Sequence, residues 1–127
     1  MKVLALDYGR ARTGVAVSDP TGTIARPLEV VGGGDIARIV RLIEEHAVDR
    51  VVVGMPLTLR GEHGEQARET EAFMKTLGDA TPVPIVPFDE RFTTNLAEQS
   101  ASGAKDEDAH AAAHLLSGYL TWTNAEA

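Results

Sequence analysis

The chain has 127 residues, of which 12 are Lys or Arg and 19 are Asp or Glu, so that its formal net charge is −7. This length suits one domain over residues 1–127, and the absence of cysteine excludes disulfides and a cysteine nucleophile. An acidic balance argues against a protein that coats nucleic acid electrostatically. No apolar run is long enough for a membrane span and no signal peptide opens the chain, so we expect a cytoplasmic protein that has no membrane partner.

The first quarter of the chain predicts three neighbouring strands. Apolar residues alternate in segments that are separated by short turn signals such as Asp19-Pro20-Thr21-Gly22, and connections this short join antiparallel strands. The predicted strands are Lys2–Asp7, Thr13–Ser18 and Thr23–Val31.

The rest of the chain predicts helices that alternate with strands. Asp35 is a candidate N-cap for a helix that ends near His46, and Val51–Val53 have the continuous apolar character of a strand buried on both faces. Three prolines within 82–88 predict a strand at an edge of the sheet. The later predicted elements are a strand at Arg50–Gly54, a helix at Gly64–Leu77, a strand at Pro82–Phe88, a short helix from Thr93 or Thr94 to Ser102, and a last helix at Glu107–Trp122.

This order of elements predicts an α/β fold with a mixed five-stranded sheet, three strands antiparallel and then two parallel, and with helices on its faces. Ligands of such sheets gather beyond the carboxyl ends of the parallel strands. Asp7 ends the first predicted strand, and Asp89 and Glu90 follow the last one. We therefore expect these carboxylates at the same edge of the sheet.

Asp108 is the third acidic position, and its helical phase indicates that it points inward. It precedes the apolar positions of the last predicted helix by multiples of a helical turn. These positions are Ala112, Leu115, Leu116, Tyr119 and Leu120. Three converging carboxylates are hard oxygen ligands that suit Mg²⁺ or Mn²⁺, and a pair of such ions supports phosphodiester hydrolysis. An acidic protein could then hold a nucleic acid through metal bridges.

Five motifs in order resemble the YqgF family, also called RuvX, which is described as Holliday junction resolvases and nucleases of pre-ribosomal RNA. They are Leu6-Asp7-Tyr8-Gly9, Gly14-Val15-Ala16-Val17-Ser18, Gly54-Met55-Pro56-Leu57, Asp89-Glu90-Arg91-Phe92-Thr93-Thr94 and the helix from Asp108 to Tyr119. The resemblance implies a ribonuclease H-like fold and metal-dependent hydrolysis of nucleic acid, with maturation of the 5′ end of pre-16S rRNA as the expected role. It makes Asp7, Glu90 and Asp108 the catalytic, metal-binding triad.

Basic and hydroxyl side chains near the triad are candidate contacts to the substrate. The resemblance places Arg91, Thr93 and Thr94 beside Glu90, and turns of the more basic half of the chain carry Arg10 and Arg12. Relatives carry a longer, Lys- and Arg-rich segment before the final aspartate, where this chain has Lys105 as its only base. This difference affects the expected affinity for substrate more than the expected fold.

Other interpretations remain open. The same fold could cleave branched DNA, or could serve as a non-catalytic module that binds RNA or protein. The opening motif also resembles the phosphate-binding start of actin- and Hsp70-type ATPases, but those proteins need two such domains. His110 and His114 have the spacing of a metal pair, yet we interpret them as structural. An apolar patch could form a homodimer, although no motif indicates one.

Overall fold

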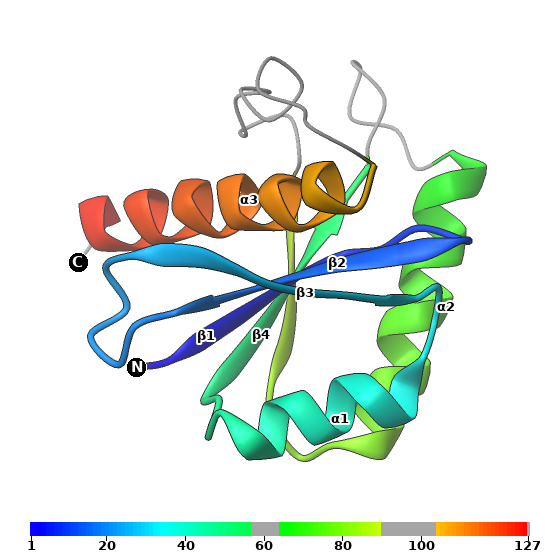
Figure 1. Ribbon diagram of the computed structural model, residues 1–127, viewed down its shortest axis with the longest axis horizontal. Coiled ribbons are helices and arrows are strands. Elements are labelled where there is room, and N and C mark those ends of the chain that lie inside the picture. The colour runs from blue at the N-terminus through cyan, green and yellow to red at the C-terminus, as the bar shows by residue number, and fades with distance from the viewer. Residues whose placement is uncertain (57–63, 90–103, 127) are drawn as a thin grey trace.

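The structure is a computed structural model that describes residues 1–56, 64–89 and 104–126. Strands and helices follow the predicted order (Figure 1). The elements are β1 (Val3–Asp7), β2 (Arg12–Ser18), β3 (Ala25–Gly32), α1 (Ile36–Glu45), β4 (Arg50–Met55), α2 (Glu65–Ala80), β5 (Ile85–Asp89) and α3 (Ala104–Glu126). The short helix predicted from Thr93 or Thr94 to Ser102 lies outside the described residues.

The five strands form one mixed sheet in the order β3-β2-β1-β4-β5. β1 is antiparallel to β2 and β2 to β3, whereas β4 is parallel to both β1 and β5. The predicted fold class is therefore confirmed, including the position of the proline-rich strand at an edge. Pro87 lies on that edge strand with its side chain exposed.

Several ends of elements differ from the predictions. The second strand begins at Arg12, so the turn after Asp7 is shorter than expected. The third strand begins at Ala25 because the Asp19 carboxylate accepts hydrogen bonds from the backbone N–H groups of Thr23 at 2.8 Å and Ile24 at 2.9 Å, which keeps these residues in the turn. α3 is longer than predicted at both ends.

Helix α1 begins where the sequence indicated. The Asp35 carboxylate accepts a hydrogen bond from the N–H of Arg38 at 3.2 Å, which confirms the predicted N-cap. The preceding Gly34 has φ +71°, a left-handed conformation that glycine adopts without a steric penalty. Gly34 therefore makes a tight entry into α1.

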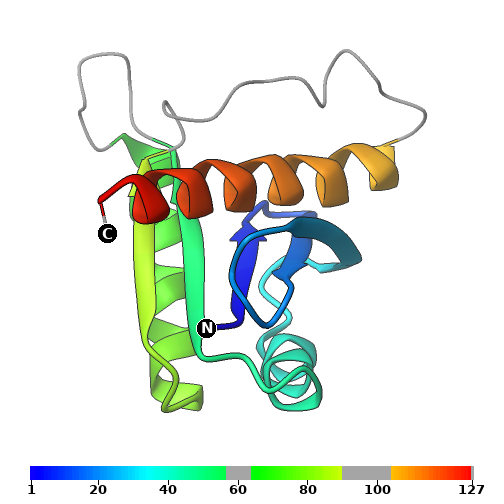
Figure 2. The same cartoon turned by 90° about the vertical axis from the view of Figure 1, so that its left-hand side faces the viewer.

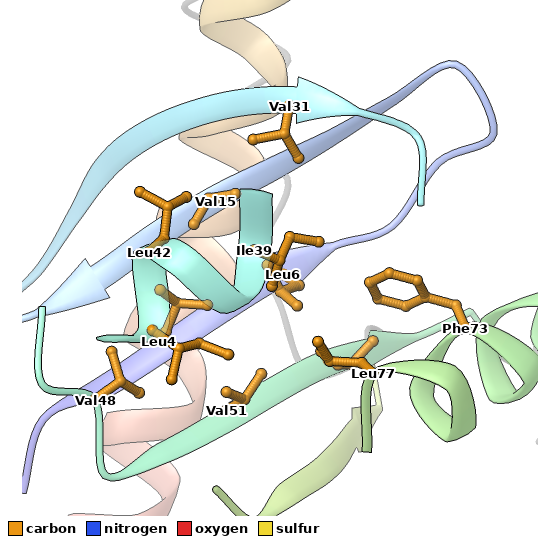
Figure 3. Close-up of a cluster of buried hydrophobic side chains, with 12 residues drawn as sticks. Leu4, Leu6, Val15, Val31, Ile39, Leu42, Val48, Val51, Phe73 and Leu77 are labelled. Carbon is orange, nitrogen blue, oxygen red and sulfur yellow. The ribbon is translucent and has the colours of Figure 1, made fainter. Parts of the chain in front are cut away.

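Helices cover both faces of the sheet, and each face has its own apolar core. α1 and α2 pack on one face with Leu4, Leu6 and Val15, part of the cluster that Figure 3 shows. α3 crosses the other face (Figure 2), where Val3 and Ala5 of β1 meet apolar side chains of the helix. The inward residues of α3 are those that the sequence predicted: Ala112, Leu115, Leu116, Tyr119 and Leu120 are all buried. None of the described helices has the length and apolar character needed to cross a membrane.

Candidate active site at the carboxyl end of the sheet

Asp7 is the last residue of β1, and its side chain lies on the face of the sheet that α3 covers. Side chains alternate along a strand, and Val3 and Ala5 belong to the core beneath α3 while Leu4 and Leu6 belong to the opposite core. Asp7 continues the first series and is half-buried. The strand therefore directs this carboxylate toward α3 at the carboxyl end of the sheet.

Gly14 brings the first turns of α3 to Asp7. In the antiparallel pairing of β1 and β2, Gly14 is the direct partner of Asp7, which sets their Cα atoms about 5 Å apart. A Cβ atom on Gly14 would lie 1.9 Å from the backbone oxygen of Asp108, so only a glycine permits this approach. Asp108 is distant from Asp7 in the sequence. The close contact places the backbone of Asp108 beside Gly14, which is the strand partner of Asp7.

The Asp108 carboxylate is held by Arg12 of β2. Arg12 Nε lies 2.9 Å from Asp108 Oδ2, and the two side chains are 44% and 31% exposed. The relative orientation of the groups does not meet the geometry of a hydrogen bond, so Oδ2 is a buried acceptor that has no hydrogen-bond donor among the described residues. The contact is an ion pair that neutralises Asp108, and it leaves the acceptor capacity of this oxygen unused.

The third predicted carboxylate falls outside the described residues. β5 ends at Asp89, which pairs in register with Met55 at the end of β4. Glu90, Arg91, Thr93 and Thr94 follow in the part of the chain that the structure does not describe. Lys105 lies in the first turn of α3, where only the backbone is described. Within the described residues no group of three or more His, Asp or Glu side chains could hold a metal ion.

Arg10, the other basic residue of this turn, faces away from Asp108. Its guanidinium donates to both carboxylate oxygens of Glu69 on α2, with Nε at 3.0 and 2.9 Å, and lies 3.9 Å from Glu65. The hydrogen bond to Glu69 raises the pKa of Arg10, and the same bond lowers the pKa of the Glu69 carboxyl group. Arg10 and Arg12 therefore pair with acids of different helices, on opposite faces of the sheet.

A cleft of about 470 Å³ opens on the Arg10 side. It lies between the β1–β2 turn and α2, and Tyr8, whose ring stacks on Phe73 with centroids 4.5 Å apart, forms part of its wall. The lining residues are Tyr8, Gly9, Arg10, Glu65, Gln66 and Glu69. Asp7 and Asp108 do not line this cleft, because they belong to the face under α3. The cleft beside Arg10 and the site of Asp7 and Asp108 are therefore on different faces of the sheet.

Three features of the site could not be read from the sequence pattern. These are the contact of Gly14 with α3 and the ion pairs of Arg12 and Arg10. Each joins elements that are remote in the chain, and no local spacing encodes such a contact. His110 and His114 are partly buried on α3, in keeping with a structural role.

Comparisons with known proteins agree with the sequence motifs. The profile of the family described as "RuvX: Holliday junction resolvase" matches residues 1–122. A protein of Chloroflexus aurantiacus named "Putative pre-16S rRNA nuclease" is 50% identical over 101 residues, which cover 76% of this chain and 66% of that relative. A protein of the same name from Rubrobacter xylanophilus is 46% identical over 127 residues, covering 94% of this chain and 91% of the relative.

The solved structures support the fold. RuvC of Thermus thermophilus, determined in complex with a Holliday junction substrate, superposes with a TM-score of 0.61 over 96% of both chains, at 18% sequence identity. A likeness at this identity supports a shared ribonuclease H-like architecture, whereas the family assignment comes from the profile and the curated relatives. The strand order, the five ordered motifs and the match over residues 1–122 together show that this chain belongs to the RuvX family.

Proposed function

We propose that residues 1–127 form a single nuclease domain that hydrolyses phosphodiester bonds of RNA with the help of divalent metal ions, and that it matures the 5′ end of pre-16S rRNA. The observation that carries this proposal is the meeting of β2 and α3 at Gly14, the strand partner of Asp7, which sets Asp7 and Asp108 at one end of the sheet. The pre-16S rRNA substrate follows from the names of the curated relatives.

The donor set at this end of the sheet fits Mg²⁺ or Mn²⁺. Carboxylate oxygens are the ligands that these cations prefer, and Asp108 Oδ2 is a buried oxygen that has no hydrogen-bond donor among the described residues. We propose that Asp7, Asp108 and Glu90 hold the ions. When bound, such ions supply an activated water and stabilise the leaving oxygen of the phosphodiester.

The alternation of β5 supports the inclusion of Glu90. Val86 and Phe88 belong to the core beneath α3, so the next position of that series in the sequence is residue 90. A glutamate at this position would join Asp7 and Asp108 on the same face of the sheet.

The chain's own cations would orient the substrate. We propose that Arg10, Arg12, Arg91 and Lys105 contact phosphate oxygens, and that Thr93 and Thr94 donate hydrogen bonds to the backbone or orient Glu90. For a chain with net charge −7, we expect phosphate binding to depend on a few such residues and on the bound cations.

Cleavage of branched DNA is the second candidate activity. The family description names a Holliday junction resolvase, and the RuvC fold holds a junction in its solved complex. A non-catalytic RNA- or protein-binding role is the third, and the reduced number of bases before Asp108 favours it. We further propose that the chain acts in the cytoplasm, and a homodimer remains a prediction that sedimentation can test.

The experiment compares a 5′-extended 16S rRNA fragment with a four-way DNA junction, each in Mn²⁺, in Mg²⁺ and in a chelator. We expect metal-dependent cleavage of the RNA that falls at least about 100-fold in Asp7→Asn, Glu90→Gln and Asp108→Asn, because each substitution removes one anionic ligand. Asp79→Asn is the matched control, since Asp79 is an exposed carboxylate on α2 that faces neither core.

The outcomes separate the three activities. Cleavage of the junction alone would replace the RNA substrate with branched DNA. Binding of RNA without cleavage in either metal would favour the non-catalytic role. Cleavage that persists equally in all three acidic variants would refute the proposed site.

A further inference from the structure

Arg12 is a basic side chain that forms an ion pair with Asp108, one of the proposed metal ligands. It lies on β2, two positions before Gly14, and alternation puts both residues on the face under α3. Its side chain is 44% exposed although it is ion-paired, so it can leave Asp108 without passing through the core.

We propose that Arg12 has two successive partners, Asp108 before metal binding and a substrate phosphate afterwards, so that it competes with the divalent cation for Asp108 and then assists in holding the nucleic acid. This proposal rests on the proposed function, because it requires Asp108 to be a metal ligand. It gives the ion pair a role in the order of binding, with the cation before the substrate.

The contact between Arg12 and Asp108 is the first argument. Arg12 Nε lies 2.9 Å from Asp108 Oδ2. A divalent cation that binds the same oxygen would therefore lie close to the positive guanidinium. Two positive groups at one carboxylate oxygen repel each other as well as compete for it. The ion pair therefore opposes uptake of a cation at this oxygen, and we expect Arg12 to move away when the cation binds.

The imperfect fit of the pair is the second argument. Asp108 Oδ2 is buried and has no hydrogen-bond donor among the described residues, although Arg12 is beside it. A pair built mainly for stability would align its N–H groups with the carboxylate, as Arg38 does with Glu29, where both contacts are 2.7 Å hydrogen bonds. The looser contact of Arg12 suits a side chain that must be released.

The third argument is the fate of the released side chain. The carboxyl end of the sheet is where ligands of such folds bind, and Arg12 lies there at the start of β2. A guanidinium freed from Asp108 is exposed, permanently charged and matched in geometry to two phosphate oxygens. A phosphodiester of the substrate is the anion that the proposed reaction brings to this place.

The first test measures Mn²⁺ affinity by calorimetry without nucleic acid. We expect Arg12→Gln to bind Mn²⁺ about three- to tenfold more tightly than the wild type, the range expected for losing a partly exposed ion pair and its repulsion. Arg38→Gln is the matched control, because Arg38 is also ion-paired, but to Glu29 and from helix α1 on the other face of the sheet. Its Mn²⁺ affinity should change less than about twofold.

The direction in which Mn²⁺ affinity changes in Arg12→Gln distinguishes competition with the cation from a purely structural role of Arg12. If Arg12 only fastens α3 to β2, Arg12→Gln will bind Mn²⁺ more weakly than the wild type, and weaker or unchanged binding overturns the proposal. Asp108→Asn separates this failure from failure of the proposed function. If Asp108→Asn binds Mn²⁺ as tightly as the wild type does, Asp108 is not a metal ligand and the proposed function is wrong at this site. If Asp108→Asn loses Mn²⁺ binding but Arg12→Gln does not bind Mn²⁺ more tightly, only the proposed competition between Arg12 and the cation is refuted.

The second test measures cleavage of the RNA at saturating Mn²⁺. We expect Arg12→Gln to raise KM about three- to tenfold with kcat within about twofold, because a phosphate contact that is equal in the ground and transition states changes KM. Arg12→Lys retains the charge and should recover part of the lost affinity. An unchanged KM in Arg12→Gln, or no recovery in Arg12→Lys, would overturn the second role of Arg12.

Discussion

The contact between Gly14 and α3 predicts a severe effect from one added methyl group. In Gly14→Ala, the Cβ atom would lie 1.9 Å from the backbone oxygen of Asp108, 2.6 Å from its carbonyl carbon and 3.3 Å from the N of Ala109. These are backbone atoms, so no change of rotamer can relieve the clash. Because real Cβ contacts do not fall below 3.0 Å, the start of α3 must move outward by about 1.1 Å from its position at 1.9 Å.

Moving the start of α3 should lower the free energy of unfolding modestly and should lower the rate of cleavage much more. Overpacking of this kind destabilises a fold by about 1–3 kcal/mol, which leaves a domain of this size largely folded. A misplacement of about 1 Å at a catalytic group lowers the rate about 100-fold. We therefore expect Gly14→Ala to lose about two orders of magnitude in kcat in Mn²⁺ while urea unfolding shows only a modest loss of free energy.

Gly32→Ala is the matched control for this prediction. Gly32 lies on the neighbouring strand β3, its Cβ would have no atom within 4 Å, and its φ is not in the left-handed region. The added methyl should leave activity unchanged and stability within about 1 kcal/mol of the wild type. If Gly14→Ala cleaves RNA as fast as Gly32→Ala, the position of α3 against β2 does not set the active-site geometry.

Three further predictions concern the framework around the site. Leu6→Ala should reduce the free energy of unfolding by about 2–5 kcal/mol in urea titrations, because Leu6 is fully buried in the core under α1 and α2. Tyr119→Phe should cost about 1 kcal/mol by the same assay, since the phenol accepts a hydrogen bond from Arg50 at 2.9 Å. Asp19 accepts hydrogen bonds from the Thr21 hydroxyl and from two backbone N–H groups, which hold its pKa well below the usual range. A carboxyl group with a lowered folded pKa stabilises the fold above its unfolded pKa of about 3.9 and loses this effect as the pH falls, so Asp19→Asn should be more destabilising at pH 7 than at pH 3.

Predictions from the sequence succeeded where a local period repeats. The face of α3 was predicted correctly because Ala112, Leu115, Leu116, Tyr119 and Leu120 follow the helical period over several turns, and all are buried. The edge position of β5 followed from its prolines, which cannot donate to a neighbouring strand. In both cases the physical cause acts within one element.

Predictions failed or were not possible where the cause lies between elements. Gly14 was predicted within a strand and lies within β2, but the sequence did not indicate that its lack of a side chain permits the approach of α3. The partners of Arg10 and Arg12 depend on the helices that pack above each face of the sheet. Such pairings follow from the assembled fold, and a sequence shows only that charges of both signs are present.

The charge pattern now has a structural interpretation. The first 60 residues carry most of the chain's bases, which would suggest a surface that attracts nucleic acid. Yet Arg10 and Arg12 are ion-paired with acids, and Arg38 is bound to Glu29 on its own face of the sheet. These pairs offset the positive charge of three guanidinium groups that could otherwise attract a polyanion. On the proposed function, affinity for a phosphate backbone would arise mainly when divalent cations neutralise the carboxylates, since this step would both add positive charge and release the guanidinium of Arg12.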